Sequence, residues 1–221
     1  GCAREAVDEA IAAMDPAPVA PGKYDIILRN DAMASILGAF AGMFSADAAQ
    51  KGLSPLAGRE GEDMAAECVT LMDDPLYPIN PSPFDDEGTP SVAKAVIKDG
   101  KLETLLHNLK TAKKAGVKST SNGGRSSAGS PVGVRITNFY IAPKEGTLGQ
   151  LISELGDGLL ITDFSGLHAG VNPVSGKFSV LCKGRLIKDG RDVRAVNEIT
   201  LSGDFTELLR SIVRVGGDLR F

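Results

Sequence analysis

The sequence has few of the residues that usually build a metal centre or a covalent scaffold. It contains two histidines and three cysteines among 221 residues. Cys2, Cys68 and Cys182 are widely spaced and form no C-x-x-C pair, so the sequence predicts neither a disulfide framework nor a zinc knuckle and fits a reducing, cytoplasmic setting. His107 and His168 each lack a second His or a Glu at the spacing that places two ligands on one helix face. Residue patterns alone therefore predict no metal site in this chain.

Long apolar runs and an excess of positive charge are also missing. No uninterrupted apolar stretch approaches the ~20 residues that cross a bilayer, and the chain opens on Gly1 without a basic-then-apolar signal segment. The formal net charge is −4, whereas binding to a phosphate backbone favours a basic surface. We therefore expect no contact with membranes or nucleic acids. The composition, with 43% hydrophobic and 24% charged residues, is typical of a soluble globular domain.

Hydrophobic periodicity predicts helices that occur singly between groups of strands. Helical stripes run through residues 3–14, 31–44, 102–109, 148–155 and 205–213. The last two are expected to begin with a capping box at Thr147 and Gln150 and with a cap at Asp204. Strand patterns cover residues 24–29, 92–97, 134–142, 158–164, 177–182, 185–193 and 197–201, with a hairpin turn at Asp189-Gly190. Residues 64–72 fit either a strand or a helix. The pattern predicts an α+β fold, mainly antiparallel β-sheet with several single flanking helices.

Two segments are predicted to be loops. Residues 73–91 (DDPLYPINPSPFDDEGTPS) are acidic and contain five prolines, and a loop of this length in a compact domain is often functional. Residues 119–131 (STSNGGRSSAGSP) are rich in Ser and Gly and are the most flexible-looking part of the chain.

The most distinctive local cluster is acidic. Asp85, Asp86 and Glu87 are consecutive carboxylates that can bind a cation or a peptide amine, or share a proton as an acid/base pair. The alternative is a turn in which the Asp side chains accept backbone hydrogen bonds and Gly88 has a positive φ. Residue chemistry alone favours the turn.

Other candidates for chemistry are weaker. His168 lies in a turn between strands and is the better functional candidate of the two histidines, whereas His107 is expected at the surface or its boundary. Cys68 and Cys182 stand in apolar surroundings, which predicts buried, inert thiols. No G-x-S-x-G elbow occurs, and the glycine pair at residues 123–124 is expected to be a loop. The residues therefore predict no recognisable catalytic centre.

An ordered set of motifs resembles the C-terminal half of the TldD/PmbA family, known as modulators of DNA gyrase. The set runs through the whole chain: GREGE at 58–62, CVTLMDD at 68–74, PFDDEGT at 83–89, KLETLL at 101–106, AKKAG at 112–116, GLHAGVN at 166–172, SGKFS at 175–179, VNEITLSG at 196–203 and VGGD at 215–218. The resemblance implies that residues 1–221 form a C-terminal domain with an antiparallel, β-rich α+β fold. In family proteins, an N-terminal domain of comparable size accompanies it.

The resemblance also identifies a branch of the family. TldD-type members carry an HExxxH helix whose histidines bind a metal and whose Glu acts as general base. Matching that helix places Leu37 and Gly42 at the histidine positions and Gly38 at the Glu position. These residues offer no zinc ligand, so the chain resembles the TldE/PmbA-type branch and is expected to be inactive as a protease alone.

That branch implies a set of partners and a role. The resemblance implies a bacterial or archaeal cytoplasmic complex with a TldD-type metalloprotease subunit, which holds the metal and degrades or matures unfolded peptides. We expect a homodimer in isolation and peptide contacts from Asp85, Asp86, Glu87 and His168. An alternative is a protease-independent regulator that binds peptides or proteins as a homodimer. A third is an independent hydrolase built on Asp85, Asp86 or His168.

Overall fold

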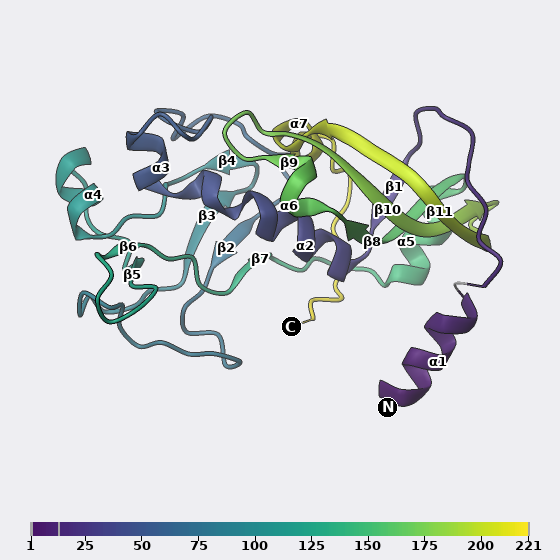
Figure 1. Cartoon of the computed structure of the whole chain (residues 1–221), viewed down its shortest axis with the longest axis horizontal. Coiled ribbons are helices and arrows are strands. Elements are labelled where there is room, and N and C mark those ends of the chain that lie inside the picture. The colour runs from purple at the N-terminus through teal and green to yellow at the C-terminus, as the bar shows by residue number, and fades with distance from the viewer. Residues whose placement is uncertain (1, 13, 221) are drawn as a thin grey trace.

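Two β-sheets follow one another along the long axis of the molecule, with a central helix between them (Figure 1). The computed structural model describes residues 2–12 and 14–220. The central helix, α2 (Asn30–Phe40), packs against β8 (Gly158–Ser165) of one sheet and β7 (Phe139–Ile141) of the other. It therefore joins the two halves of the molecule.

The larger sheet has the strand order β1-β8-β10-β11. Its further strands are β1 (Ile26–Leu28), β10 (Lys177–Lys188) and β11 (Arg191–Asp204), and the short β9 (Val171–Asn172) pairs with β10. Among the described residues, β1–β8 is the one parallel pair of this sheet. This order leaves the long strand β11 at an edge.

The second sheet has the order β4-β3-β2-β7, and its pairs are antiparallel. Its strands are β2 (Leu71–Asp73), β3 (Lys94–Lys98), β4 (Lys101–Leu102) and β7. A separate antiparallel pair joins β5 (Gly123–Gly124) to β6 (Gly133–Val134). The predicted α+β class with mainly antiparallel sheet is confirmed.

Short helices flank these sheets. They are α1 (Cys2–Ala12), the 3-10 helix η1 (Ala41–Phe44), α3 (Ala46–Gln50), α4 (Leu109–Ala115), α5 (Leu148–Leu155), α6 (Leu167–Gly170) and α7 (Phe205–Arg210). The capping box predicted for α5 is present, because Thr147 and Gln150 each accept from the other's backbone N–H. Asp204 caps α7 by accepting from the N–H groups of Thr206 and Glu207.

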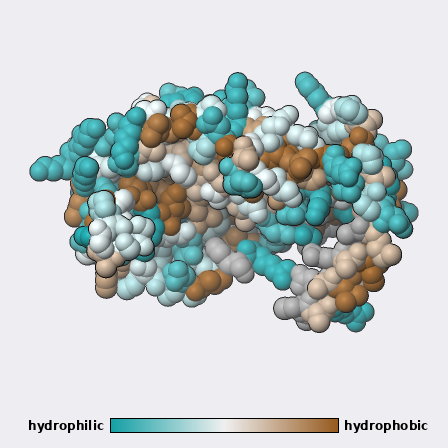
Figure 2. Space-filling model, viewed as in Figure 1, coloured by the Kyte–Doolittle hydropathy of each residue, from teal (hydrophilic) through white to brown (hydrophobic). Residues whose placement is uncertain are grey.

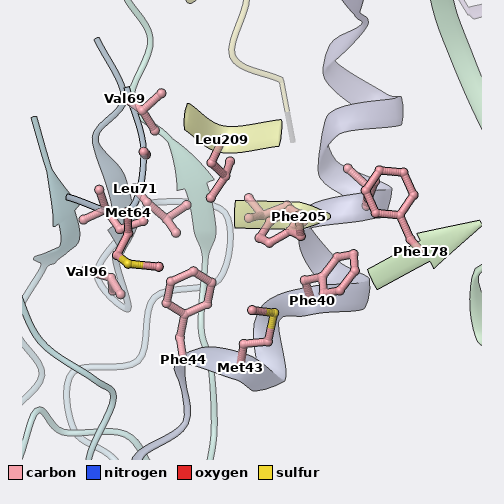
Figure 3. Close-up of a cluster of buried hydrophobic side chains, with 14 of the residues drawn as sticks. Phe40, Met43, Phe44, Met64, Val69, Leu71, Val96, Phe178, Phe205 and Leu209 are labelled. Atoms are coloured by element: carbon pink, nitrogen blue, oxygen red, sulfur yellow. The ribbon is translucent and has the colours of Figure 1, made fainter. Parts of the chain in front are cut away.

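One hydrophobic core extends from the larger sheet across α2 to the second sheet. The Phe40 ring stacks on Phe205 with centroids 4.4 Å apart and meets the Phe178 ring edge-on at 6.1 Å. Each such aromatic pair adds about 0.5–1.5 kcal/mol to the free energy gained by burial. Figure 3 shows this region of the core, with Phe40, Met43, Phe44, Met64, Val69, Leu71, Val96, Phe178, Phe205 and Leu209 labelled.

Two Asp-Gly turns connect antiparallel strands. Asp99-Gly100 joins β3 to β4, and Asp189-Gly190 joins β10 to β11 as predicted. Both residues of each turn have positive φ, the backbone that two-residue hairpins favour and that Gly adopts without strain. A Cβ at Gly100 would lie 2.6 Å from the Ala65 carbonyl oxygen, so this turn is also packed against a neighbouring segment.

The helix predicted over residues 102–109 is wrong. Leu102 ends β4, residues 103–108 are not helical, and α4 begins only at Leu109. Leu102, Leu105 and Leu106 are all buried because an irregular stretch of chain enters the core there. Their spacing imitates a helical stripe. The true helix start is a capping box of Asn108 and Thr111.

Other segments differ from the predicted bounds. The strands predicted over 177–201 form two long strands with a register shift between Cys182 and Gly184, and Glu198 has a positive φ there. The strand predicted over 134–142 is split into β6 and β7. The segment expected to be flexible, 119–131, contains the buried residues Ser121 and Asn122, which lead into β5.

Helix α1 projects from the lower right of the molecule in Figure 1. Val7 and Ile11 are exposed, and Figure 2 shows apolar surface along this helix. Residue 13, within the helix predicted over 3–14, lies outside the described residues. None of the helices in the described part of the chain is both long and apolar enough to cross a membrane.

Candidate functional site

The carboxylate of Asp85 is at the centre of the acidic turn, residues 85–89. The N–H groups of Glu87 and Thr89 donate to Asp85 Oδ1 at 3.0 and 2.8 Å, and the N–H of Gly123 donates to Oδ2 at 2.8 Å. Asp85 is 3% exposed, and Gly88 has a φ of 78°. These features are those of the turn interpretation, and they leave no acceptor site of Asp85 facing solvent.

Asp86 and Glu87 also accept hydrogen bonds from distant segments. The N–H of Arg125 donates to Asp86 Oδ2 at 2.8 Å, and the N–H of Leu109, the first residue of α4, donates to Glu87 Oε2 at 2.7 Å. A carboxylate at a helix N-terminus is electrostatically favourable. Asp86 is exposed and Glu87 half-buried, so these two keep oxygen atoms within reach of a ligand. Their contact with a peptide stays a prediction.

Gly123 allows the acidic turn to dock on β5. A Cβ at this position would lie 2.7 Å from Glu87 Cγ and 2.9 Å from Asp85 Oδ2. Any larger residue would therefore push the turn away. The glycine pair expected to be a loop is in fact the short strand on which the acidic turn rests.

A buried ion pair lies at the base of the acidic segment (residues 73–91), where this segment leaves β2. Lys94 Nζ lies 2.8 Å from Asp73 Oδ2, with the side chains 13% and 0% exposed. Asn122 Nδ2 donates to the same oxygen at 2.8 Å, and the N–H and hydroxyl of Thr137 donate to Oδ1, each at 2.8 Å. This hub joins β2, β3, the 119–124 segment and the start of β7. Its partners are far apart in the sequence, and no local motif indicates them.

His168 stands in a different part of the molecule. It is exposed on α6 and lines an open hollow of about 450 Å³ beside α2. The other lining residues are Ser35, Gly38, Ala39, Leu167, Val171 and Pro173. The acidic turn does not line this hollow. The structure therefore brings Asp85, Asp86 and Glu87 together and leaves His168 apart from them.

The residues that the resemblance matches to the HExxxH helix do not fit a metal. Leu37 is 2% exposed and belongs to the core, while Gly38 and Gly42 are exposed, and a Cβ on either would meet no atom within 4 Å. Among the described residues, no group of three or more His, Cys, Asp or Glu side chains is placed to hold a metal ion. Alkyl and hydrogen side chains have no lone pair to donate to zinc. No catalytic step through a metal follows from this helix.

The expectation that His107 lies at the surface or its boundary is wrong. It is 5% exposed, because it follows the two leucines that enter the core. Nδ1 has no hydrogen-bond partner within the described part of the chain. Burial lowers the pKa of His107, partly opposed by a hydrogen bond with the Thr111 backbone and by the Glu60 carboxylate. Burial therefore disfavours the charged imidazolium form of this side chain.

The two described cysteines have unremarkable surroundings. Burial raises the pKa of Cys182 to about 11, so its thiol stays protonated and unreactive near neutral pH. This agrees with the predicted inert thiol. Cys68 is half-buried and donates to the Ile212 carbonyl oxygen at 3.4 Å.

The chain is similar to known proteins over most of its length. Residues 21–221 match the family described as PmbA/TldA metallopeptidase C-terminal domain. A protein of Archaeoglobus fulgidus named metalloprotease is 35% identical over 185 residues, which are 83% of this chain and 42% of that protein. The metalloprotease PmbA of Escherichia coli O157:H7 is 27% identical over 220 residues, which are 99% of this chain and 45% of that protein.

Two solved structures share the fold closely. A protein of Thermotoga maritima described as a candidate modulator of a DNA gyrase has a TM-score of 0.91 and 41% identity, covering 96% of this chain and 49% of that one. TldE of Thermococcus kodakarensis has a TM-score of 0.89 and 28% identity, covering 97% of this chain and 49% of that one. The chain spans about half the length of these relatives. With the family match covering residues 21–221, the chain belongs to the PmbA/TldD metallopeptidase family through its C-terminal domain.

Proposed function

We propose that this chain is part of a non-catalytic subunit in a TldD/TldE-type metalloprotease complex that degrades or processes peptides. One observation carries the proposal. The domain keeps the family fold, and Leu37, Gly38 and Gly42, which the resemblance matches to the ligands and general base of the HExxxH helix, carry no metal-binding side chain. A TldD-type partner then supplies the metal, and with it the activated water that attacks the peptide bond.

The same proposal covers the setting of the complex. We expect a cytoplasmic heterodimer with the TldD-type subunit, a homodimer when that subunit is missing, and no metal in this chain. The relatives named metalloprotease and TldE support the family context. The substrate class is an unfolded peptide, as in peptide maturation.

An extended peptide has a strand edge available in this domain. β11 is an edge strand, and Ala17, which is distant in the sequence, occupies one position on it by donating its N–H to the Ala195 carbonyl oxygen at 3.3 Å. Arg194 donates to the Ala17 and Pro18 carbonyl oxygens and holds that segment in place. A peptide adding to the rest of this edge would gain backbone hydrogen bonds irrespective of its sequence.

The predicted peptide contacts are sharpened by the geometry. Asp86, Glu87 and His168 remain our candidates for polar contacts with the peptide. Asp85 is assigned to holding the turn, because its oxygens accept three backbone N–H groups. Replacing Asp85 therefore tests stability, whereas Asp86→Asn tests binding.

The second candidate is a regulator that binds peptides or proteins as a homodimer without a protease. The exposed apolar residues of α1 and of the segment after β2 favour some form of association. A gene for an HExxxH relative beside this one would favour the protease complex.

The deciding experiment mixes the full-length protein with its TldD-type subunit and follows cleavage of a labelled unfolded peptide. We expect cleavage by the pair and by neither a chelator-treated pair nor this protein alone. A matched control replaces the Glu of the partner's HExxxH by Gln. Cleavage by this protein alone that survives a chelator would overturn the proposal, and a TldD-type subunit fully active without it would favour the regulator.

A further inference from the structure

The acidic segment between β2 and β3 folds into two consecutive closed lobes. In the first lobe (residues 75–82), the N–H of Ser82 donates to the Pro75 carbonyl oxygen at 2.7 Å. In the second lobe (residues 83–91), the N–H of Ser91 donates to the Pro83 carbonyl oxygen at 3.0 Å. The second lobe contains the acidic turn. Figure 1 shows the segment leaving the lower end of β2 and extending away from the body.

Large apolar side chains of this segment face solvent. Ile79 and Phe84 are each 61% exposed, Leu76 is 46% exposed, and Val92, just after the second lobe, is 60% exposed. Figure 2 shows apolar surface at the tip where the first lobe projects. Single exposed apolar residues are ordinary, but several on one short segment indicate an interaction surface.

A polar cluster forms the root of the first lobe. The rings of Tyr77 and Tyr140 meet edge to face, with centroids 5.6 Å apart and planes at 65°. The Tyr140 hydroxyl hydrogen-bonds to the Asp74 side chain. Asp74 Oδ1 also accepts from the N–H of Leu76 at 2.9 Å, and Asn138 Nδ2 donates to the Asp74 carbonyl oxygen at 2.8 Å. The aromatic rings, the carboxylate and the apolar tip are thus fixed together.

The charged residues within this segment are all acidic. Residues 73–91 contain five carboxylates and no Lys or Arg. Asp73 is neutralised by the buried Lys94, and Asp86 has only a distant ion pair with Arg135, at 3.9 Å. Asp74 therefore presents a negative charge beside two aromatic rings. Such a site attracts an ammonium or guanidinium group, which also gains from the ring faces.

We infer that the first lobe binds an extended peptide in which a Lys or Arg is flanked by apolar residues. Asp74 takes the cationic group beside Tyr77 and Tyr140, and Leu76 and Ile79 contact the apolar residues. This inference rests on the proposed function and deepens it by naming the kind of peptide that is bound. It assigns the cationic group to the base of the first lobe, because there a carboxylate lies beside two aromatic rings and exposed apolar side chains, while Asp86 and Glu87 remain candidates for further polar contacts.

The test measures direct binding to the chain by fluorescence anisotropy. The probes are three labelled, unstructured peptides of equal length, built from Lys and Leu, from Glu and Leu, and from Lys and Ser. We expect the Lys–Leu peptide to bind at least about tenfold more tightly than either of the others, and to weaken as salt is raised to about 0.15 M. Equal affinity for the Lys–Leu and Glu–Leu peptides, or no binding of any peptide, overturns the inference.

Matched variants locate the surface. We expect Leu76→Ser with Ile79→Ser, and separately Asp74→Asn, to weaken binding of the Lys–Leu peptide about tenfold. The apolar control is Leu181→Ser, 55% exposed on β10, and the charge control is Asp163→Asn, an exposed carboxylate on β8. The side chains at positions 74, 76 and 79 are exposed or half-buried, so we expect these variants to fold. A melting temperature equal to that of the wild type shows that each variant is folded. Equal losses in the controls overturn the inference.

Two further outcomes separate this inference from its alternatives. Because no TldD-type subunit is present, binding is measured whether or not the protease complex exists, and failure of joint cleavage leaves this result standing. Sedimentation of the same variants detects a competing use of the surface. If Leu76→Ser with Ile79→Ser dissociates a dimer without affecting peptide binding, the surface joins two copies of the chain and the inference is overturned.

Discussion

The sequence predicts peptide contacts at the acidic turn and at His168, but the two regions use their polar groups differently. In the acidic turn, Asp85 and Glu87 accept hydrogen bonds from the backbone of β5 and α4. In the hollow beside α2, His168 is exposed and Gly38 offers no side chain. The first region connects segments of the chain, and the second is open surface. A run of carboxylates is therefore identified as a binding surface only once the partners of its oxygens are known.

The largest expected effect comes from the base of the acidic segment. Asp73→Ala removes the partner of Lys94, which is 13% exposed, and leaves a buried charge uncompensated. We expect a loss of about 3–5 kcal/mol in the free energy of unfolding, measured with denaturant. Asp163→Ala, on the exposed face of β8, is the control and should change it by less than about 0.5 kcal/mol. Equal effects would mean that the hub contributes nothing.

A smaller loss is expected within the turn itself. Asp85→Ala leaves the N–H groups of Glu87, Thr89 and Gly123 without their acceptor. We expect a loss of about 1–3 kcal/mol. Asp86→Ala removes one acceptor from an exposed position, so its effect should be under about 1 kcal/mol. The comparison fails if Asp86→Ala is the more damaging of the two in denaturant unfolding.

The two histidines sharpen the comparison through pH. Burial lowers the pKa of His107 from its ordinary value of 6.5, so between the folded and unfolded pKa values the unfolded state binds more protons. Stability should be full above pH 6.5 and decline as the pH falls below it. His107→Leu should flatten the dependence of the melting temperature on pH between about 7 and 5.

His168→Gln is the matched control for that experiment, because the chain has two histidines and this one is exposed. We expect the pH dependence of wild type to persist in this variant. A His107→Leu curve that parallels wild type would show that another group titrates.

The smallest effect belongs to the hollow. Gly38 lies within α2, and a Cβ there would meet no atom within 4 Å. Gly38→Ala should therefore stabilise the domain by about 0.5–1 kcal/mol, through helix propensity alone. Destabilisation measured by thermal unfolding would mean that a methyl group at position 38 is not accommodated on the surface of α2. A stabilised variant with weaker joint cleavage would assign Gly38 to a partner contact.

Local signals in the sequence predicted the elements that local interactions determine. The Thr147 capping box, the Asp204 cap and the Asp189-Gly190 turn depend on neighbours within a few residues, and all three are present. The helix predicted over 102–109 failed because Leu102, Leu105 and Leu106 share burial without sharing a helix. Leucine spacing alone does not distinguish these two cases.

The candidate site was less predictable for a related reason. Asp73 meets Asn122 and Thr137, and Glu87 meets Leu109, across long stretches of chain. Such contacts depend on the sheet order, which periodicity does not provide. Tyr77 and Tyr140 likewise meet only because β2 and β7 are neighbours.

The parallel pairing of β1 with β8 has a consequence for synthesis on the ribosome. Ile26 pairs with Leu159, and at about 5–20 residues per second the second strand emerges roughly 7 to 27 seconds after the first. During that interval, Phe40 and the apolar face of α2 have no β8 to pack against. The β10–β11 hairpin is local in the sequence. Once both of its strands have been translated, it forms in about 1–10 microseconds. A ribosome that pauses before residue 158 thus prolongs the exposure of an unpaired strand and an aromatic helix face, so chaperone demand should peak while residues 41–157 are being translated.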